Sequence, residues 1–158
     1  MRTITDSQGR AYDLDLNVQS YRRVLADTGI DLGLIKGPGP KGQPLLVEIR
    51  ESMITLFDVL WAIVRPKAQK SKVNFDDFQT AFFGPEYIAA RDAFLEEWAL
   101  FCRTLGRVSD AEIVEKFQEA RESETSSALK TLNEGIGGFS TTSLSSPPES
   151  SASPIQAD

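Results

Sequence analysis

The sequence predicts a mainly α-helical fold, in which an N-terminal β-hairpin is followed by a small bundle of about four to five helices and a disordered Ser/Pro-rich C-terminal tail. Three observations predict it: apolar and polar residues alternate near the N-terminus, apolar residues recur at three- and four-residue steps through the middle, and the C-terminal end has almost nothing to bury. The chain has 158 residues, of which 41% are hydrophobic and 25% charged, as in one ordinary soluble domain. Packing alone can stabilise a domain of this length, so folding needs neither a disulfide nor a metal.

The predicted hairpin joins residues 3–5 and 11–16 through a turn at residues 6–10. Its second strand alternates apolar and polar side chains, as a half-buried strand does. Gly9 lies where a tight turn requires a positive φ, which glycine adopts without a steric cost. The N-terminal segment is therefore expected to be a two-stranded antiparallel ribbon.

Helices are predicted where apolar residues recur with helical spacing between recognisable end signals. Asn17 and Asn74 are suitable N-caps, and Gly29 is a suitable helix end. The segment 36–44 contains three glycines and three prolines and is predicted to be a loop. Pro66 is expected to end the helix that precedes it. The predicted helices cover residues 18–28, a short and a longer helix within 45–64, a segment that starts after residue 74, and 85–105.

The C-terminal third is predicted to form an extension and a tail outside the main domain. Ser109-Asp110-Ala111-Glu112 matches a capping box and opens a charged amphipathic segment. Residues 139–158 contain seven serines and three prolines, so chain entropy is expected to keep them disordered. The predicted division is a hairpin and helical domain over residues 1–106, a helical extension over 107–138, and the tail.

Composition argues against several classes of function. A single cysteine, Cys102, and the lack of histidine exclude a disulfide framework, a Cys/His zinc site and any mechanism with an imidazole base. The net charge of −6 and the pI near 4.8 argue against nucleic acid as a partner. No apolar run reaches the roughly 18 residues of a membrane span, and the N-terminus lacks the apolar core of a signal peptide. We therefore expect a cytoplasmic protein that binds no nucleic acid, membrane, cofactor or metal.

Two patterns begin like known ligand sites but lack the residues that the chemistry requires. Residues 37–44 have the glycine spacing of a phosphate-binding loop, but glutamine and proline stand where that loop needs lysine and then serine or threonine. Residues 13–24 begin like a calcium loop, but valines occupy its glycine and bidentate glutamate positions. A linker and the exposed face of a hairpin strand explain these segments better.

Acidic pairs and the lone cysteine are the remaining candidates for chemistry. The pairs at residues 76–77 and 96–97, with Asp92 one turn before the second pair, would suit acid/base or magnesium chemistry only if further groups converged on them. The first pair lies at a predicted helix start, where negative charge is stabilising. Cys102 lies on an apolar stripe and has no histidine partner, so we expect it to be buried and inert. The sequence predicts no enzyme.

The aromatic content is the strongest functional signal in the chain. Nine phenylalanine and tryptophan residues fall within residues 57–101. Most have core spacing, but we expect a few short helices to leave some rings exposed, and exposed rings would form a groove for an apolar helix of a partner. The candidate contact residues are Leu56, Phe57, Leu60, Trp61, Phe82, Phe83 and Trp98.

The order of the pieces resembles that of tail assembly chaperones of long-tailed bacteriophages and prophages. The pieces are a hairpin turn with Gly9-Arg10, the helix pattern Val-x-x-Tyr-Arg-Arg-Val-Leu-x-x-Thr-Gly at residues 18–29, and Phe-Asp-Val-Leu-Trp-Ala-Ile-Val-Arg-Pro at residues 57–66. The likeness continues through residues 72–78 and 89–97. It covers roughly the hairpin and helical domain and does not include the serine-rich C-terminus.

The resemblance implies a small, mainly helical, non-enzymatic protein that binds the long tape measure protein while the tail is built. Such a chaperone keeps its client soluble, helps to recruit tail tube subunits, acts in the bacterial cytoplasm and is absent from the finished virion. The acidic tail would help to keep the complex in solution.

Two other functions stay open on sequence grounds. The protein would be a structural tail or neck component if it associated with its own copies through the hairpin edge. It would be a small cytoplasmic adaptor if the Ser/Pro-rich tail were itself the ligand of other proteins.

Overall fold

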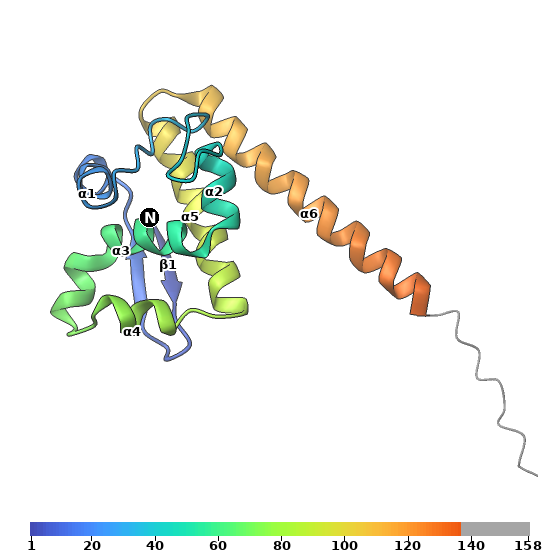
Figure 1. Cartoon of the computed structure of the whole chain (residues 1–158), viewed down its shortest axis with the longest axis horizontal. Coiled ribbons are helices and arrows are strands. Elements are labelled where there is room, and N and C mark those ends of the chain that lie inside the picture. Colours follow the sequence, from blue (N-terminus) through green and yellow to red (C-terminus); the bar gives the residue numbers. More distant parts are fainter. Residues whose placement is uncertain (137–158) are drawn as a thin grey trace, which may run out of the picture. The chain divides into compact units, whose positions relative to one another are not determined.

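The computed structural model describes residues 1–136, except for the side chains of residues 121–122 and 132–136. The predicted disorder of residues 139–158 lies outside the described residues. The fold is mainly helical with an N-terminal two-stranded antiparallel hairpin, as the sequence predicts (Figure 1). The chain divides into two units, Met1–Glu122 and Ser123–Asp158. The described elements are β1 (Arg2–Thr5), β2 (Ala11–Leu14), α1 (Val18–Thr28), α2 (Leu45–Glu51), α3 (Met53–Lys70), α4 (Phe75–Thr80), α5 (Pro85–Thr104) and α6 (Val108–Ile136).

The hairpin is held at its turn by a buried carboxylate. β1 and β2 pair with Ile4 opposite Tyr12, and Gly9 has the predicted positive φ of 77°. Asp6, which is 3% exposed, accepts hydrogen bonds from the main-chain N–H and the Nε of Arg10 at 2.9 and 2.6 Å. The hydroxyl of Tyr12 donates to the same carboxylate at 3.0 Å. These bonds fix the turn to the second strand.

Two long helices cover the inner face of the hairpin. α5 packs against β1, and α3 packs against β2. Figure 1 shows β1 on the α5 side of the hairpin. Leu14 is fully buried and Ile4 is 3% exposed, so the inward side chains of both strands belong to the core.

α1 begins and ends at the predicted residues, and the chain that follows it buries the apolar side chains of Ile30, Leu32 and Ile35. The side chain of Asn17 accepts hydrogen bonds from two N–H groups of the first turn at 2.9 and 3.0 Å, and Gly29 ends the helix with a φ of 72°. Leu32 in the next segment is fully buried, and its carbonyl accepts the indole N–H of Trp98 at 2.9 Å. This bond ties the segment to α5.

The loop predicted at residues 36–44 is organised by a buried glutamate on α2. Glu48 is 1% exposed, and its Oε1 accepts the main-chain N–H groups of Lys41 and Gln43 at 2.6 and 3.2 Å. Gly39 passes so close that a Cβ would lie 2.5 Å from Oε2 of Glu48. The loop therefore needs a residue without a side chain at this position.

The prediction that Pro66 ends its helix is wrong, because α3 continues through it to Lys70. Proline has no N–H, so within the helix the carbonyl of Ala62 lacks its usual donor. Arg23 on α1 supplies donors from outside the helix: its Nε donates to the Ala62 carbonyl, and its Nη2 donates to the Ile63 carbonyl at 3.1 Å. The guanidinium thus replaces the hydrogen bond that proline removes.

Replacing Arg23 with alanine is expected to lower the free energy of unfolding by about 1–2 kcal/mol, because the Ala62 carbonyl loses its donor. In a Pro66→Ala background the new N–H of residue 66 can bond to that carbonyl. The cost of Arg23→Ala should then fall to roughly half or less. Urea unfolding of the wild type, both single variants and the double variant measures the coupling. Equal costs in both backgrounds would show that Arg23 acts through other contacts.

The predicted end signals of α4 and α5 are confirmed. The side chain of Asn74 accepts the N–H of Asp77 at 2.8 Å and caps α4. α5 starts at Pro85, directly after Gly84, which has a φ of 58°. Proline at the first helical position loses no intrahelical hydrogen bond.

α6 begins before the predicted capping box at residues 109–112, which corrects that prediction. Its first residue is Val108, so the serine of the box already lies inside the helix. Arg107 forms an ion pair with Asp110 at 2.6 Å across the first turn. This pair places a negative charge near the N-terminus of the helix, where it is favourable.

The first compact unit extends to Glu122, past the boundary predicted at residue 106. Ala111 and Val114 on α6 are fully buried, so the start of this helix belongs to the core. Arg103 on α5 binds both carboxylate oxygens of Glu115 at 2.8 and 2.6 Å. In the second unit, residues 123–131 of α6 are exposed.

Candidate functional site

Five of the seven residues predicted to contact a partner are buried in the core, which corrects the prediction that they line an open groove. Their side chains come from α3, from the segment after α4, and from α5. Each is at most 3% exposed, so a partner cannot touch them in this structure. The five are Leu56, Phe57, Leu60, Phe82 and Trp98.

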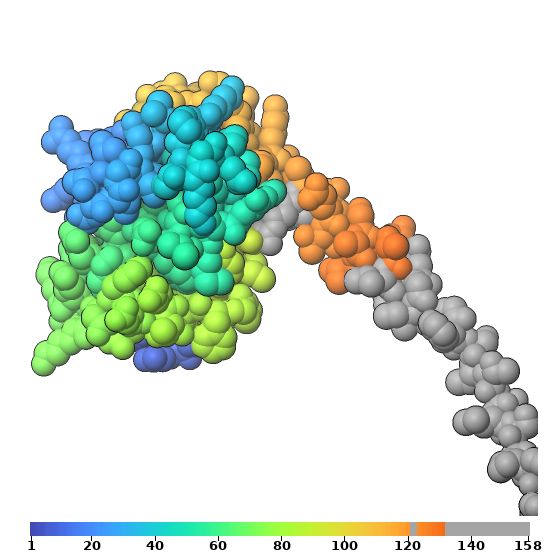
Figure 2. All heavy atoms as spheres, viewed as in Figure 1, coloured from blue at the N-terminus to red at the C-terminus, as the bar shows by residue number. Residues whose placement is uncertain are grey.

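The hairpin helps to cover the aromatic cluster around Phe57 and Phe82. Tyr12 of β2 lies edge-on to Phe78 of α4, with 5.2 Å between the ring centroids. Phe78 lies 4.9 Å from Phe82 and 6.1 Å from Phe57, which are favourable distances for aromatic pairs. The helices alone do not enclose this cluster, and β2 supplies another wall. In the space-filling view α3 and α4 form the lower part of the front in green, below α1 and the segment after it in blue and cyan, and only a little of the hairpin is visible in dark blue at the lower edge (Figure 2).

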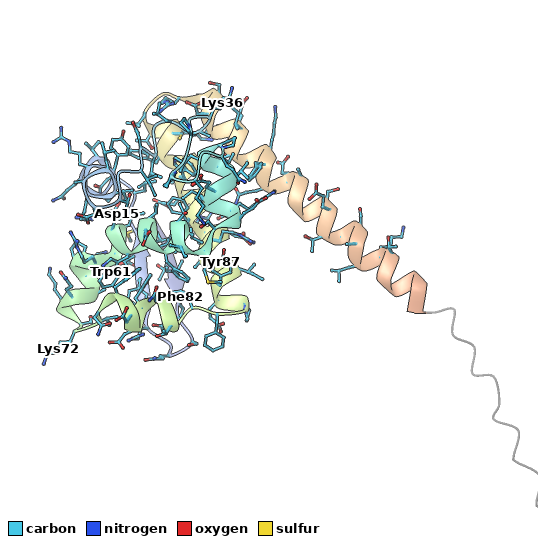
Figure 3. All side chains as sticks on the ribbon, in the orientation of Figure 1. Asp15, Lys36, Trp61, Lys72, Phe82 and Tyr87 are labelled. Carbon is cyan, nitrogen blue, oxygen red and sulfur yellow. The ribbon has the colours of Figure 1, made fainter. Side chains whose placement is uncertain are left out.

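Trp61 is one of the two predicted contact residues that reach the surface (Figure 3). Its ring packs against Phe78 and Phe75 at centroid distances of 5.5 and 5.7 Å. It also borders a surface hollow of about 410 Å³, which we call the Trp61 hollow. The lining residues are Asp27, Thr28, Asp58, Trp61, Ala62, Arg65 and Phe75.

The Trp61 hollow combines aromatic surface with charge. Asp27 and Arg65 form an ion pair at 3.0 Å on its rim. Burial raises the pKa of Asp58 above its ordinary value of 3.8, because the ionised carboxylate is partly removed from water. A cationic side chain that entered beside Trp61 would meet both an aromatic ring and an incompletely compensated carboxylate. The hollow is therefore suited to a mixed apolar and basic contact.

Phe83 is the second predicted contact residue at the surface, and it is 61% exposed. Its neighbour Phe82 is only 2% exposed, so the two rings face opposite environments. Gly84 follows with a positive φ and turns the chain into α5. A large aromatic ring in water is a favourable contact point for a partner protein.

The two acidic pairs and the cysteine lie on α4 and α5. Asp76 and Asp77 lie in the first turn of α4, where the helix dipole favours negative charge. Glu96 is exposed whereas Glu97 is 5% exposed, so the two neighbours do not share one site. Burial raises the pKa of the Cys102 thiol above its ordinary value of 9.0, which disfavours the reactive thiolate.

The described part of the chain holds neither a cluster of metal-ligating side chains nor a membrane-spanning helix. Among the side chains that the structure describes, no three of His, Cys, Asp or Glu are grouped as metal ligands would be. No helix in the same part has the length and apolar character needed to cross a membrane.

Three buried carboxylates were missed by the sequence analysis. They belong to Asp6, Glu48 and Glu97, which are 3%, 1% and 5% exposed. Asp6 and Glu48 bind main-chain N–H groups of neighbouring loops. No spacing rule distinguishes such residues from solvated surface charges. A clue was available only for Glu48, which lies within the apolar run of α2.

Comparison with family models, with curated proteins and with solved structures gives no match to this chain.

Proposed function

We propose that this protein is a non-enzymatic tail assembly chaperone that binds the tape measure protein while the tail of a long-tailed phage or prophage is built. The order of motifs in residues 1–106 supports the identity of the client. The structural observation that carries the proposal is Phe83, a phenylalanine ring 61% exposed at the corner between α4 and α5. Exposed aromatic rings of this kind anchor protein partners.

The surface chemistry fits a client rich in apolar helices. Phe83 offers a ring to the apolar stripe of such a helix, and the Trp61 hollow accepts an adjoining apolar or basic side chain. The net charge of −6 would keep the complex in solution while the client is unassembled. Tail tube subunits would be the second partner. The protein would act in the host cytoplasm and leave before the virion is complete.

Phe83→Ser is expected to weaken client binding by about tenfold, because an exposed aromatic anchor is lost. Stability should change by no more than about 0.5 kcal/mol, since the ring packs against little. The measurement is co-expression with a tape measure protein, followed by the soluble fraction of that client. Ile54→Ser, at a site that is 70% exposed, is the matched control and should leave the client soluble.

Other outcomes would favour the other functions. A stoichiometric band of this protein in purified virions would identify a structural tail or neck component. Removal of residues 123–158 should leave client binding intact, because Phe83 and Trp61 lie in the unit Met1–Glu122. Loss of all partner binding on that removal would instead identify an adaptor that acts through its tail.

A further inference from the structure

The outer edge of β1 presents main-chain groups that point away from the hairpin. The N–H of Asp6 donates to the carbonyl of Arg10 at 3.0 Å, so this pair closes the hairpin. Antiparallel strands alternate hydrogen-bonded and non-hydrogen-bonded pairs. The register therefore directs the N–H and C=O of Ile4 toward β2, and those of Thr3 and Thr5 outward.

Among the described residues, the outward groups of the two threonines lack partners. Ser7 continues the same alternation, and its N–H donates to the Ala81 carbonyl at 2.9 Å. For Thr3 and Thr5, neither the N–H nor the C=O has a main-chain or side-chain partner among the described residues. This edge thus offers two donors and two acceptors at the spacing with which another strand pairs.

Two hollows of about 340 and 370 Å³ lie along this edge, between β1 and α5. We call them together the β1 groove. Residues 1–5 line it on the strand side. Pro85, Glu86, Ala89, Ala93, Glu97 and Leu100 line it on the helix side.

The side chains on the helix side of the β1 groove are small and partly apolar in its middle. Ala89 and Ala93 lie one turn apart on α5, so another backbone can approach the helix closely there. Ala89 is exposed and Ala93 is half-buried. Leu100, which is 50% exposed, offers apolar surface toward one end. An extended chain would fit such a surface better than a helix, because a helix cannot pair with the free strand edge.

The charge of the helix side is negative. The Glu97 side chain is 6% exposed, and its Oε2 forms an ion pair with the terminal ammonium of Met1 at 3.3 Å. Glu86 has no ion pair in the part of the chain that the structure describes. The Glu97 charge is thus compensated by Met1, and Arg2 on the strand side pairs with Glu96 at 2.6 Å. Glu86 is therefore the carboxylate of the groove that favours a cationic partner.

We propose that the β1 groove binds an extended, basic segment of a partner protein, which adds to the hairpin as a third strand. The N–H and C=O groups of Thr3 and Thr5 would pair with its main chain, and Glu86 would bind a lysine or arginine side chain. The inference goes beyond the proposed chaperone function, because it concerns another surface and does not depend on the identity of the client.

A second copy of this chain fits the groove less well. It would bring another negatively charged α5 to the same place, and each chain carries a net charge of −6. A basic segment removes this repulsion and adds attraction. Self-association is therefore an outcome that the experiment must detect.

The test is a selection of random decapeptides displayed on phage against the full chain, followed by affinity measurements with the selected peptides. We expect them to combine alternating β-branched or small residues with at least one lysine or arginine. Thr5→Pro removes the outward N–H of residue 5 but no hydrogen bond of the hairpin. It should raise the dissociation constant of the peptide about tenfold. Thr5→Ala keeps the N–H, so its dissociation constant should stay within about twofold of the wild-type value. Glu86→Gln should weaken binding mainly at low salt.

A second variant that blocks the groove keeps the test valid if Thr5→Pro does not fold. Ala89→Arg changes an exposed helical position, fills the groove and repels a basic peptide, so it should abolish binding while the circular dichroism spectrum is unchanged. The proposal is overturned if no peptide is enriched, if the selected peptides bind both blocked variants as tightly as the wild type, or if sedimentation shows a dimer that Thr5→Pro dissociates.

Discussion

Trp98→Ala is expected to lower the free energy of unfolding by about 3–5 kcal/mol. The indole is fully buried on α5, and its N–H donates to the carbonyl of Leu32 at 2.9 Å. Alanine would leave a cavity beside Phe94, whose ring centroid lies 5.7 Å from that of Trp98. It would also release the buried segment that follows α1. Urea unfolding followed by circular dichroism measures the loss.

Two control variants separate cavity, hydrogen bond and surface effects. Trp98→Phe keeps most of the volume and loses the bond to Leu32, so it should cost about 1–3 kcal/mol. Leu100→Ala, on the same helix but 50% exposed, should cost no more than about 0.5 kcal/mol. If Trp98→Ala kept full stability but no longer bound a client, Trp98 would be a contact residue and its assignment to the core would be mistaken.

Local chemistry explains which parts of the fold the sequence could predict. The caps at Asn17, Gly29 and Asn74 depend on residues within a few positions of each helix end, and all three are confirmed. Gly9 at the hairpin turn and Pro85 at the start of α5 belong to the same class. In each case one residue type suits one backbone conformation, whatever the rest of the chain does.

Contacts between distant residues explain where prediction failed. A proline usually ends a helix, and α3 passes through Pro66 because Arg23, far away in the sequence, binds the carbonyl of Ala62. The charged start of α6 is part of the compact unit because Ala111 and Val114 fit into the core. Periodicity in one segment carries no information about such partners.

The candidate site was predicted only in part, for a related reason. Helical spacing shows which face of a helix is apolar, but it does not show how many other elements cover that face. Tyr12 of the hairpin covers Phe78 and Phe82, so the expected groove is filled. Trp61 lies at the border of this cluster, and Phe83 lies beyond it, so only these two predicted residues reach the surface.

The second large effect is expected at Asp6, where alanine should lower the free energy of unfolding by about 3 kcal/mol. The carboxylate is buried and accepts bonds from the main chain and side chain of Arg10 and from the hydroxyl of Tyr12. Removal leaves these donors without an acceptor and frees the hairpin turn. The hairpin covers the aromatic core, so thermal unfolding and near-ultraviolet circular dichroism should both report the loss.

The contribution of Asp6 should also depend on pH. Burial alone would raise its pKa, but the hydrogen bonds from Arg10 and Tyr12 outweigh burial and lower the pKa below its ordinary value of 3.8. A lowered pKa means that the ionised carboxylate stabilises the fold above the unfolded-state pKa and stops doing so as the pH falls through the folded-state pKa. The advantage of the wild type over Asp6→Asn should therefore be constant between pH 7 and 5 and shrink below about pH 4. An advantage over Asp6→Asn that stayed the same from pH 7 down to pH 2 would show that the charge of Asp6 does not stabilise the hairpin.

The hydroxyl of Tyr12 provides a second check at alkaline pH. Burial and the hydrogen bond to Asp6 raise the pKa of Tyr12 to about 12. The protonated hydroxyl therefore stabilises the fold below about pH 10, and this contribution is lost as the pH rises from about 10 toward 12.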